Sequence, residues 1–288
     1  MKLSFFMVEE HSPAYSVTWG INDIIYTEKT PYQNLSIIET EEFGRALVLD
    51  NILQTTINDE FYYHEMIAHV PLFTHADPRR VLIIGGGDGG TAREVLKHKS
   101  VESIDLVDID ECVIAACRKY LPELSCSFDD PKVNVIITNG VEYVQKQKSK
   151  YDVIIIDSTD PFPEGPAMDL YSRDFYKNVY HCLKDDGLFV SHTESPCFSF
   201  SRHIFQEIQK RINACFPLTN VYITCVPSYI SGYWSFTIGS KRYDPLRDYR
   251  HDSSIKTLFY TGELHKACFV LPRFMQEIIA KNRMNKCK

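Results

Sequence analysis

The sequence lacks the features of a secreted, membrane-spanning or metal-stapled protein. Its nine cysteines form no C-x-x-C pair, and their spacing matches neither a zinc site nor a disulfide framework. Cys112 and Cys117 fall in a helical pattern and are expected to be packing residues. The amino terminus has no basic segment followed by a long apolar run, and no apolar stretch is long enough to span a membrane. We therefore expect no signal peptide, no membrane partner and a cytoplasmic protein.

Positive charge is also scarce. The chain has 31 Lys and Arg against 38 Asp and Glu, a formal net charge of -7. This balance argues against a nucleic-acid partner and mildly for a cationic ligand, although an ordinary acidic surface explains the charge more simply. The sequence contains no internal repeat and no low-complexity segment. A chain of 288 residues that is 44% hydrophobic predicts one large globular domain, alone or with a smaller one.

Two patterns divide the chain, at about residue 60. Residues 1–60 alternate apolar and polar residues in short runs such as Asn34–Glu39 and Arg45–Leu49, separated by turns such as Asp50-Asn51, which predicts a small antiparallel β-domain. Asp59 is expected to N-cap a helix that runs to about Val70.

From Val81 the pattern is strand, helix, strand, helix. This alternation predicts an α/β domain over residues 61–288, with right-handed βαβ units around a mostly parallel sheet. Two late strands near Val221–Val226 and Trp234–Gly239 are expected to close the sheet. The other expected strands are Val81–Ile84, Ile104–Val107, Val133–Ile137, Val153–Ile156 and Leu188–Val190, and the expected helices include Thr91–His98, Cys112–Tyr120 and Asp174–Leu183.

The most informative stretch follows the first of these strands. Gly85, Gly87 and Gly90 have the G-x-G-x-x-G spacing of nucleotide-binding loops, which alone is a weak signal. Asp88 lies inside this loop, where a pyrophosphate site should avoid an anion. A carboxylate here suits a nucleoside with a cationic extension.

Further polar residues follow the neighbouring strands, and ligands of such sheets bind beyond the carboxyl ends of the strands. Asp108 lies about 20 residues after the loop, the spacing of a carboxylate that binds ribose hydroxyls. Asp110 is suited to cap the next helix. Asp157 and Asp160 follow a wholly apolar strand and predict a cation-binding, proton-accepting cluster, although a capped turn before Pro161 would also explain them.

The charge of Asp88 limits which nucleoside the loop can bind. The amino-acid carboxylate of S-adenosylmethionine, placed ~4 Å from Asp88, would cost about 4 kcal/mol at an effective dielectric of about 20. That is roughly a thousandfold in affinity. Without that carboxylate, the remaining ammonium would attract Asp88. The loop is therefore predicted to prefer decarboxylated S-adenosylmethionine.

With these residues in place, the chain resembles the polyamine aminopropyltransferases, most closely bacterial spermidine synthases. The resemblance covers nearly the whole chain. It implies a β-domain followed by a Rossmann-like, methyltransferase-type domain, a homodimer or higher homo-oligomer, and no metal or redox cofactor. It is carried by Tyr32-Gln33, Leu49–Met66, Gly85–Gly90, Val107–Asp110, Asp157–Pro161, Gly165–Ala167 and Ser231-Gly232.

The resemblance also implies roles for individual residues. Asp157 would be the proton acceptor, and Asp88 would hold the aminopropyl ammonium. The donor nucleoside would be bound by Gln33, Gln54, Gly85, Asp108, Asn139, Gly140 and Pro166. The amine would be bound by Tyr63, His64, Asp88, Asp157, Asp160 and Tyr229, with Glu9 as a weaker candidate for its far ammonium.

Four departures from the family pattern bear on these roles. Asn139 stands where many members have Asp, Ile230 where Pro is usual, and His192 where Gln is frequent; the loop around Phe162–Gly165 is longer. All but the first lie near the expected amine pocket and leave the identity of the amine open among putrescine, agmatine, cadaverine and spermidine. A small-molecule methyltransferase, a dehydrogenase and an inactive scaffold remain as alternatives of other classes.

Overall fold

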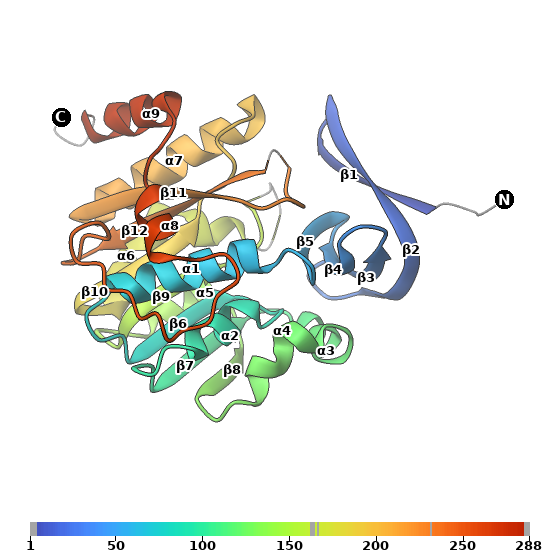
Figure 1. Ribbon diagram of the computed structural model, residues 1–288, viewed down its shortest axis with the longest axis horizontal. Helices are drawn as coiled ribbons and strands as arrows, with labels where there is room; N and C mark the ends of the chain where they lie inside the picture. Colours follow the sequence, from blue (N-terminus) through green and yellow to red (C-terminus); the bar gives the residue numbers. More distant parts are fainter. Residues whose placement is uncertain (1–4, 162–164, 166, 231, 285–288) are drawn as a thin grey trace.

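The computed structural model describes residues 5–161, 165, 167–230 and 232–284, with the side chains of 283 and 284 left out. It contains an N-terminal five-stranded antiparallel sheet and a larger seven-stranded α/β sheet, which confirms the predicted fold class (Figure 1). The first sheet pairs its strands in chain order: β1 (Phe5–Ser12), β2 (Tyr15–Lys29), β3 (Asn34–Thr40), β4 (Gly44–Leu49) and β5 (Ile52–Thr56). Asp50 and Asn51 have positive φ angles of 48° and 63° and form the expected tight turn between β4 and β5.

The larger sheet has the order β11-β12-β10-β9-β6-β7-β8. Its strands β10, β9, β6, β7 and β8 are parallel, and β12 and β11 add to one edge in antiparallel pairs. The strands are β6 (Arg80–Gly85), β7 (Ser103–Asp108), β8 (Val133–Ile137), β9 (Tyr151–Asp157), β10 (Leu183–His192), β11 (Leu218–Cys225) and β12 (Tyr233–Ser240).

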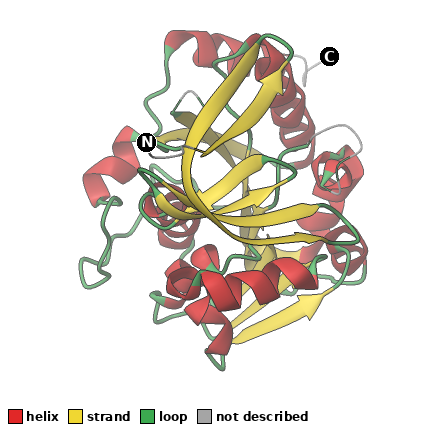
Figure 2. Ribbon diagram, turned by 90° about the vertical axis from the view of Figure 1, so that its right-hand side faces the viewer, coloured by secondary structure: helices red, strands yellow, loops and turns green. Residues whose placement is uncertain are grey.

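Helices flank the strands on both sides, as Figure 2 shows. They bury both faces of the central strands, which explains why β6 and β9 are continuous apolar runs rather than alternating ones. The helices are α1 (Phe61–Thr74), α2 (Gly90–Leu96), α3 (Glu111–Tyr120), α4 (Pro122–Ser125), α5 (Gly140–Gln145), α6 (Arg173–Cys182), α7 (Ser199–Cys215), α8 (Gly262–Ala267) and α9 (Arg273–Met284), with short 3₁₀ turns η1 (Cys126–Asp129) and η2 (Met168–Tyr171).

Helix α1 differs from its prediction at both ends. Its N-cap is Glu60, without a side-chain cap bond, and it continues through Pro71 to Thr74 instead of ending near Val70. The predicted cap, Asp59, instead accepts hydrogen bonds from Thr56 Oγ1 (2.6 Å) and from the backbone N–H of Ser228 (2.7 Å). The Asp59 side chain was predicted to cap the helix, but it hydrogen-bonds to Thr56 and to a distant loop instead.

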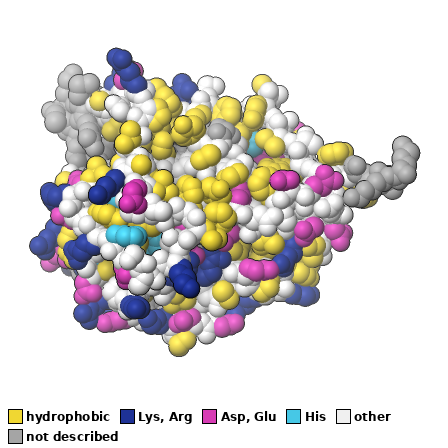
Figure 3. Space-filling model, in the orientation of Figure 1, with side chains coloured by type: hydrophobic (Ala, Val, Ile, Leu, Met, Phe, Trp, Pro, Cys, Tyr) yellow, Lys and Arg dark blue, Asp and Glu magenta, His cyan; other side chains and the backbone are white. Residues whose placement is uncertain are grey.

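The surface adds two observations. Hydrophobic side chains gather across the middle of the face shown in Figure 3, with charges of both signs around its edges. None of the described helices is long and apolar enough to cross a membrane. Among the described cysteines, Cys117 is buried as expected, while Cys112 is only half-buried, and none forms a disulfide.

Candidate active site

One cleft opens beyond the carboxyl ends of β6, β7 and β9, on the side where the N-terminal sheet lies. The strand order reverses between β6 and β9, and crevices at such a reversal are where α/β sheets bind ligands. The predicted site residue Pro166 lies outside the described residues. All the others line this cleft: Glu9, Gln33, Gln54, Tyr63, His64, Gly85, Asp88, Asp108, Asn139, Gly140, Asp157, Asp160 and Tyr229.

The glycine loop is held tightly against the end of β9. The backbone N–H of Gly86 donates to the carbonyl oxygen of Asp157 at 2.7 Å. Gly85 has a φ of 81°, and a Cβ at this position would collide with that same carbonyl oxygen. Glycine is therefore required at 85 both for the turn and for the contact with Asp157.

Asp108 approaches the loop from the end of β7. A Cβ on Gly87 would lie 2.8 Å from Asp108 Oδ2, so the missing side chain is what admits the carboxylate. Burial raises the pKa of Asp108 to about 6. The neighbouring Asp110 caps α3 by accepting from the N–H of Cys112, as suggested by the sequence, and also accepts from Gln33 Nε2 at 3.0 Å. This last bond ties the loop after β2 to the nucleoside side of the cleft.

Two polar side chains on this side already have backbone partners. Asn139 Oδ1 accepts from the N–H of Val141 at 2.8 Å and so caps α5, a use that the sequence analysis did not predict. Gln54 Nε2 donates to the carbonyl of Ile52 at 3.1 Å. Gly140 begins α5 close to the end of β6, where a Cβ would lie 2.6 Å from Ile84 Cγ2.

Asp88 and Asp157 face the centre of the cleft in different environments. Asp157 accepts from Tyr63 OH at 2.9 Å and from Thr91 Oγ1 at 2.7 Å, while burial and the negative charge of Asp88 raise its pKa. Asp88 accepts from the N–H of Gly90 at 2.6 Å and lies 3.5 Å from His64 Nε2. Although burial opposes it, the charge of His64 keeps the pKa of Asp88 below its usual value. One carboxyl is thus more basic than usual and the other is held ionised.

The far end of the cleft holds a second pair of acids. Burial raises the pKa of Asp160 to about 7, and Glu194, which shares a hydrogen bond with it, also has a raised pKa because of burial and that neighbour. Glu9 is buried here and accepts from Trp19 Nε1 at 2.6 Å. His192 Nε2 lies 2.7 Å from the carbonyl of Ser158, while its Nδ1 is 3.7 Å from Asp160. A cation would be favoured at this end.

Sequence reasoning missed two residues that lie beside the cleft, Thr91 and Glu194, and two that line it, His11 and Trp234. Thr91, which holds Asp157, directly follows the glycine loop at the start of α2, and this position could have drawn attention to it. Glu194 comes just after β10, near the end of the strand, as Asp108 and Asp157 lie at the ends of β7 and β9. His11 and Trp234 also line the cleft, but neither lies in a motif that would have revealed it.

The described residues include one cluster with the composition of a metal site, formed by His75, Asp152 and Asp186. It lies at the opposite end of the sheet, because Asp152 is the second residue of the strand that Asp157 ends. Lys184 Nζ already contacts both carboxylate oxygens of Asp152, at 2.8 and 2.9 Å. His75 Nδ1 accepts from the N–H of Asp77, which leaves the proton of a neutral imidazole on Nε2, the atom facing the acids. The cluster is better described as an ion-pair network.

Comparison with known proteins covers both parts of the chain. Residues 5–56 match the spermidine synthase tetramerisation domain, and residues 60–248 match the spermine/spermidine synthase domain. The polyamine aminopropyltransferase of Caldicellulosiruptor bescii is 51% identical over 279 residues, which cover 96% of this chain and 99% of the relative. That of Moorella thermoacetica is 49% identical over 272 residues, covering 94% and 95% of the two chains.

Solved structures agree. A spermidine synthase in complex with the transition-state analogue AdoDATO superposes with a TM-score of 0.93 at 42% identity, covering 96% of this chain and 95% of that one. The spermidine synthase of Thermotoga maritima gives a TM-score of 0.91 at 42% identity, with 96% and 94% coverage. Both domains of the chain match this family, and the cleft between them carries the acids described above. The protein therefore belongs to the spermine/spermidine synthase family and is an enzyme of the polyamine aminopropyltransferase type.

Proposed function

We propose that the enzyme transfers the aminopropyl group of decarboxylated S-adenosylmethionine to putrescine, giving spermidine and 5'-methylthioadenosine. The observation that carries this proposal is the placement of Asp88, Asp157 and Asp160 along one cleft that also contains the glycine loop and Asp108. A nucleoside with a cationic chain and a diamine both complement such a row of acids.

The donor half is proposed to consist of the glycine loop and the ends of β7 and β8. Asp108 would accept hydrogen bonds from the ribose hydroxyls, and Asp88 would pair with the aminopropyl ammonium. Gly85 lets the backbone approach the nucleoside closely. The remaining proposed contacts to the nucleoside are Gln33, Gln54, Asn139, Gly140 and Pro166; in the described structure Asn139 would have to share its capping oxygen with the adenine amino group.

The acceptor half is proposed to lie between α1, the end of β9 and the loop before β12. The amine nitrogen attacks the carbon beside the sulfonium, the C–N bond forms as the C–S bond breaks, and the sulfur leaves as a neutral thioether. Asp157 would take the proton, and its raised pKa makes it a better base than an ordinary carboxylate. Tyr63, Tyr229 and His64 would shape the channel, with Asp160 and Glu9 at the far ammonium.

This displacement needs neither an electron carrier nor a Lewis acid, so we propose that no metal or redox cofactor takes part. The sulfonium is already an activated leaving group, and the cation-binding carboxylates supply orientation.

A panel of amines tests the acceptor. With decarboxylated S-adenosylmethionine as donor, putrescine should give the highest kcat/KM among putrescine, cadaverine, agmatine and spermidine. A putrescine value among the lowest would show that the enzyme prefers another amine, and His192 and Ile230 would then be candidates for selecting it. The loop around Phe162–Gly165 lies outside the described residues except for Gly165.

Calorimetry separates this proposal from a methyltransferase on the same fold. The wild-type protein should bind the decarboxylated donor more tightly than S-adenosylmethionine, and Asp88→Asn should narrow that gap. Equal binding of the two nucleosides by the wild-type protein would favour the methyltransferase.

We further propose a homo-oligomer assembled through the N-terminal strands, and the match of residues 5–56 to a tetramerisation domain favours a tetramer over a dimer. Strands β1 and β2 extend away from the α/β domain in Figure 1, and they expose Phe5, Phe6, Val8 and Ile24 by 50% or more. Light scattering should show a tetramer for the wild-type protein and a smaller species for Phe6→Glu. A wild-type monomer would contradict the assembly.

A further inference from the structure

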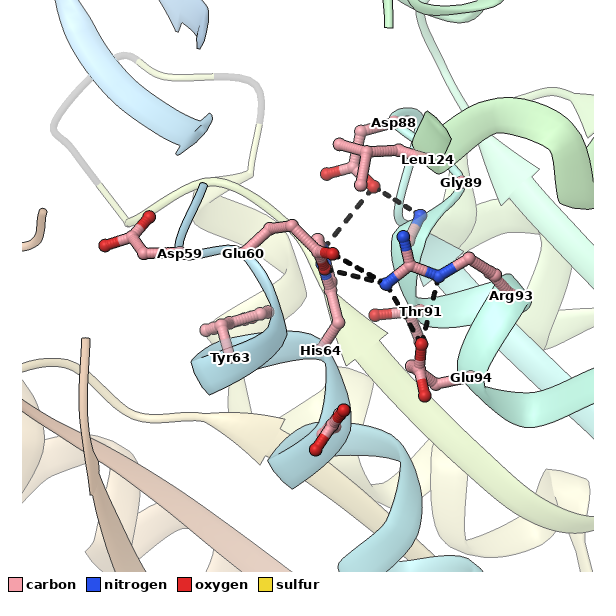
Figure 4. A network of polar contacts seen from close by, with 12 residues as sticks. Asp59, Glu60, Tyr63, His64, Asp88, Gly89, Thr91, Arg93, Glu94 and Leu124 are labelled. Carbon is pink, nitrogen blue, oxygen red and sulfur yellow. Dashed lines mark hydrogen bonds and ion pairs between the residues drawn. The ribbon is translucent and has the colours of Figure 1, made fainter. Parts of the chain in front are cut away.

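A chain of charged side chains leads from Asp88 into the interior between α1 and α2. Figure 4 shows it: Asp88 faces His64, which contacts Glu60, and Arg93 lies between Glu60 and Glu94. None of these contacts beyond His64 belongs to the proposed binding of either substrate.

The contacts of His64 favour one protonation state of its ring. Its Nδ1 lies 2.6 Å from Glu60 Oε2, and its Nε2 lies 3.5 Å from Asp88 Oδ1. Ionised carboxylates only accept hydrogen bonds, so Nδ1 carries a proton, and the second carboxylate beside Nε2 favours a proton there as well. Two flanking carboxylates therefore favour the imidazolium form of the ring. In line with this geometry, Asp88 and Glu60 hold the pKa of His64 well above its usual value although burial alone would lower it. In that form His64 would have no lone pair with which to accept a proton from the amine.

The surroundings leave little freedom for this ring. His64 is 2% exposed, and a Cβ on Gly90 would collide with its Cε1 and Nδ1 atoms. Across the contact, Arg93 Nη2 donates to both oxygens of Glu60, at 2.8 and 2.9 Å, and its Nε donates to Glu94 at 3.0 Å. Arg93 thus holds the carboxylate of Glu60 in place, and Glu60 in turn holds the ring of His64.

The charged and titratable groups around this network come from several packed elements. Helix α1 and its cap supply Glu60 and Tyr63, the glycine loop supplies Asp88, and β9 supplies Asp157. Helix α2 supplies Arg93, Glu94 and Lys97, and a second histidine of α1, His69, lies 3.0 Å from Glu94. Tyr229 and Cys117 interact electrostatically with Asp88, and His98 Nε2 lies 2.9 Å from His69 Nδ1.

We propose that Arg93 and Glu60 are positioning residues that act through His64: they hold it as an imidazolium directed at Asp88, and so keep that carboxylate ionised and oriented for the donor's ammonium. This inference rests on the proposed role of Asp88. It also revises the charge argument from sequence, because Asp88 is not an isolated anion but one half of a buried ion pair. The repulsion of a donor carboxylate is therefore weaker than the bare estimate.

Kinetics of Glu60→Gln and Arg93→Gln test the proposal. Glu60→Gln should lower kcat/KM for the donor at least about tenfold at pH 8, and the rate should fall further as the pH rises, because His64 then loses its proton more easily. Arg93→Gln leaves Glu60 charged but no longer held in place, so it should lower kcat/KM without that fall at alkaline pH, because removing a cation does not lower the pKa of His64. Arg93→Lys keeps the positive charge and should recover most of the loss. Asp105→Asn removes a half-buried carboxylate from a cluster at another edge of the sheet and should leave the profile unchanged. Identical pH profiles for wild type and Glu60→Gln would overturn the proposal.

A measurement without substrates separates this proposal from the proposed function. In the protein labelled with ¹⁵N-histidine, the signal lost in His64→Gln identifies His64. It should report an imidazolium at pH 7 in the wild type, and the pKa of His64 should be lower in Glu60→Gln because one of its two carboxylate partners is gone. A neutral ring at pH 7 in the wild type would overturn the proposal even if the enzyme is fully active. An imidazolium in a protein that transfers no aminopropyl group would instead contradict the proposed function.

Discussion

At the scale of single residues, two aspartates of the cleft have pKa values shifted in opposite directions. Asp88 is kept ionised by the imidazolium of His64 and by the N–H of Gly90, whereas burial and the charge of Asp88 make Asp157 more basic. Separating the pKa values of neighbouring carboxyls in this way assigns one to bind a cation and the other to accept a proton.

Replacing Asp157 by Asn should show this division. Loss of a general base costs about 100- to 10,000-fold in turnover, so kcat should fall within that range while donor affinity changes only a few-fold. Steady-state rates and calorimetry with the decarboxylated donor measure the two effects. Equal losses in rate and donor affinity would count against Asp157 as the base.

Donor binding should depend on the protonation of Asp108. Its pKa is raised to about 6 in the free protein, so lowering the pH through 6 neutralises the carboxylate that is proposed to accept from the ribose. Donor affinity measured by calorimetry should fall as the pH is lowered from 7 to 5. In Asp108→Asn the affinity should be weak at both values; a wild-type affinity independent of pH would remove Asp108 from the ribose site.

At the scale of elements, α1 serves the site and the fold with successive residues. Tyr63 and His64 face the cleft, whereas the buried carboxylate of Glu65 accepts the backbone N–H groups of Leu258, Phe259 and Tyr260. At its start, Asp59 holds the loop before β12, which carries Tyr229, and Tyr229 OH in turn donates to the carbonyl of Gln54 at 2.6 Å.

Replacing Asp59 should weaken amine binding without affecting donor binding, because Asp59 holds the loop that carries Tyr229. Asp59→Ala leaves the N–H and hydroxyl of Ser228 without their acceptor, and each lost bond to a charged group is worth about 1.5–3 kcal/mol. We expect KM for putrescine to rise at least about tenfold, with donor affinity unchanged. Thr55→Val, a change in the preceding strand that removes no described hydrogen bond, is the control. A proportional loss of donor affinity would show that Asp59 supports the whole cleft.

The sequence predicted elements and motifs better than it predicted partners. The parallel strands and the acids at their ends could be recognised, because apolar runs and strand-end positions are local features. The contact of Asp59 with Ser228 and the Arg93–Glu60 pair could not, because each joins groups that only the folded chain brings together. The cap formed by Asn139 is local and could have been predicted, since Asn is a preferred residue at the start of a helix.

At the scale of the molecule, the buried acids of the cleft make the stability of the fold depend on pH, and a bound cationic substrate should reduce that dependence. The pKa of Asp160 is about 7 in the fold against an ordinary 3.8, so the folded state keeps a proton that the unfolded chain releases. This retained proton stabilises the folded state. Its contribution to the free energy of unfolding is fully present below about pH 4 and is lost as the pH rises through 7.

Putrescine should offset this loss. The increase in Tm caused by saturating putrescine should be larger at pH 8, where Asp160 and Glu194 carry more negative charge, than at pH 6. Differential scanning fluorimetry of the wild type and of Asp160→Asn measures it, and the difference between the two pH values should shrink in the variant. The same increase at both pH values in the wild type would contradict this account.

The central claim is that this one cleft joins a sulfonium donor to a diamine. Its most direct test is to incubate the purified protein with decarboxylated S-adenosylmethionine and putrescine and to quantify the products by mass spectrometry. We predict spermidine and 5'-methylthioadenosine in equal amounts, and neither product with S-adenosylmethionine as the donor. Consumption of the donor without spermidine, or methylated putrescine formed from S-adenosylmethionine, would contradict the account.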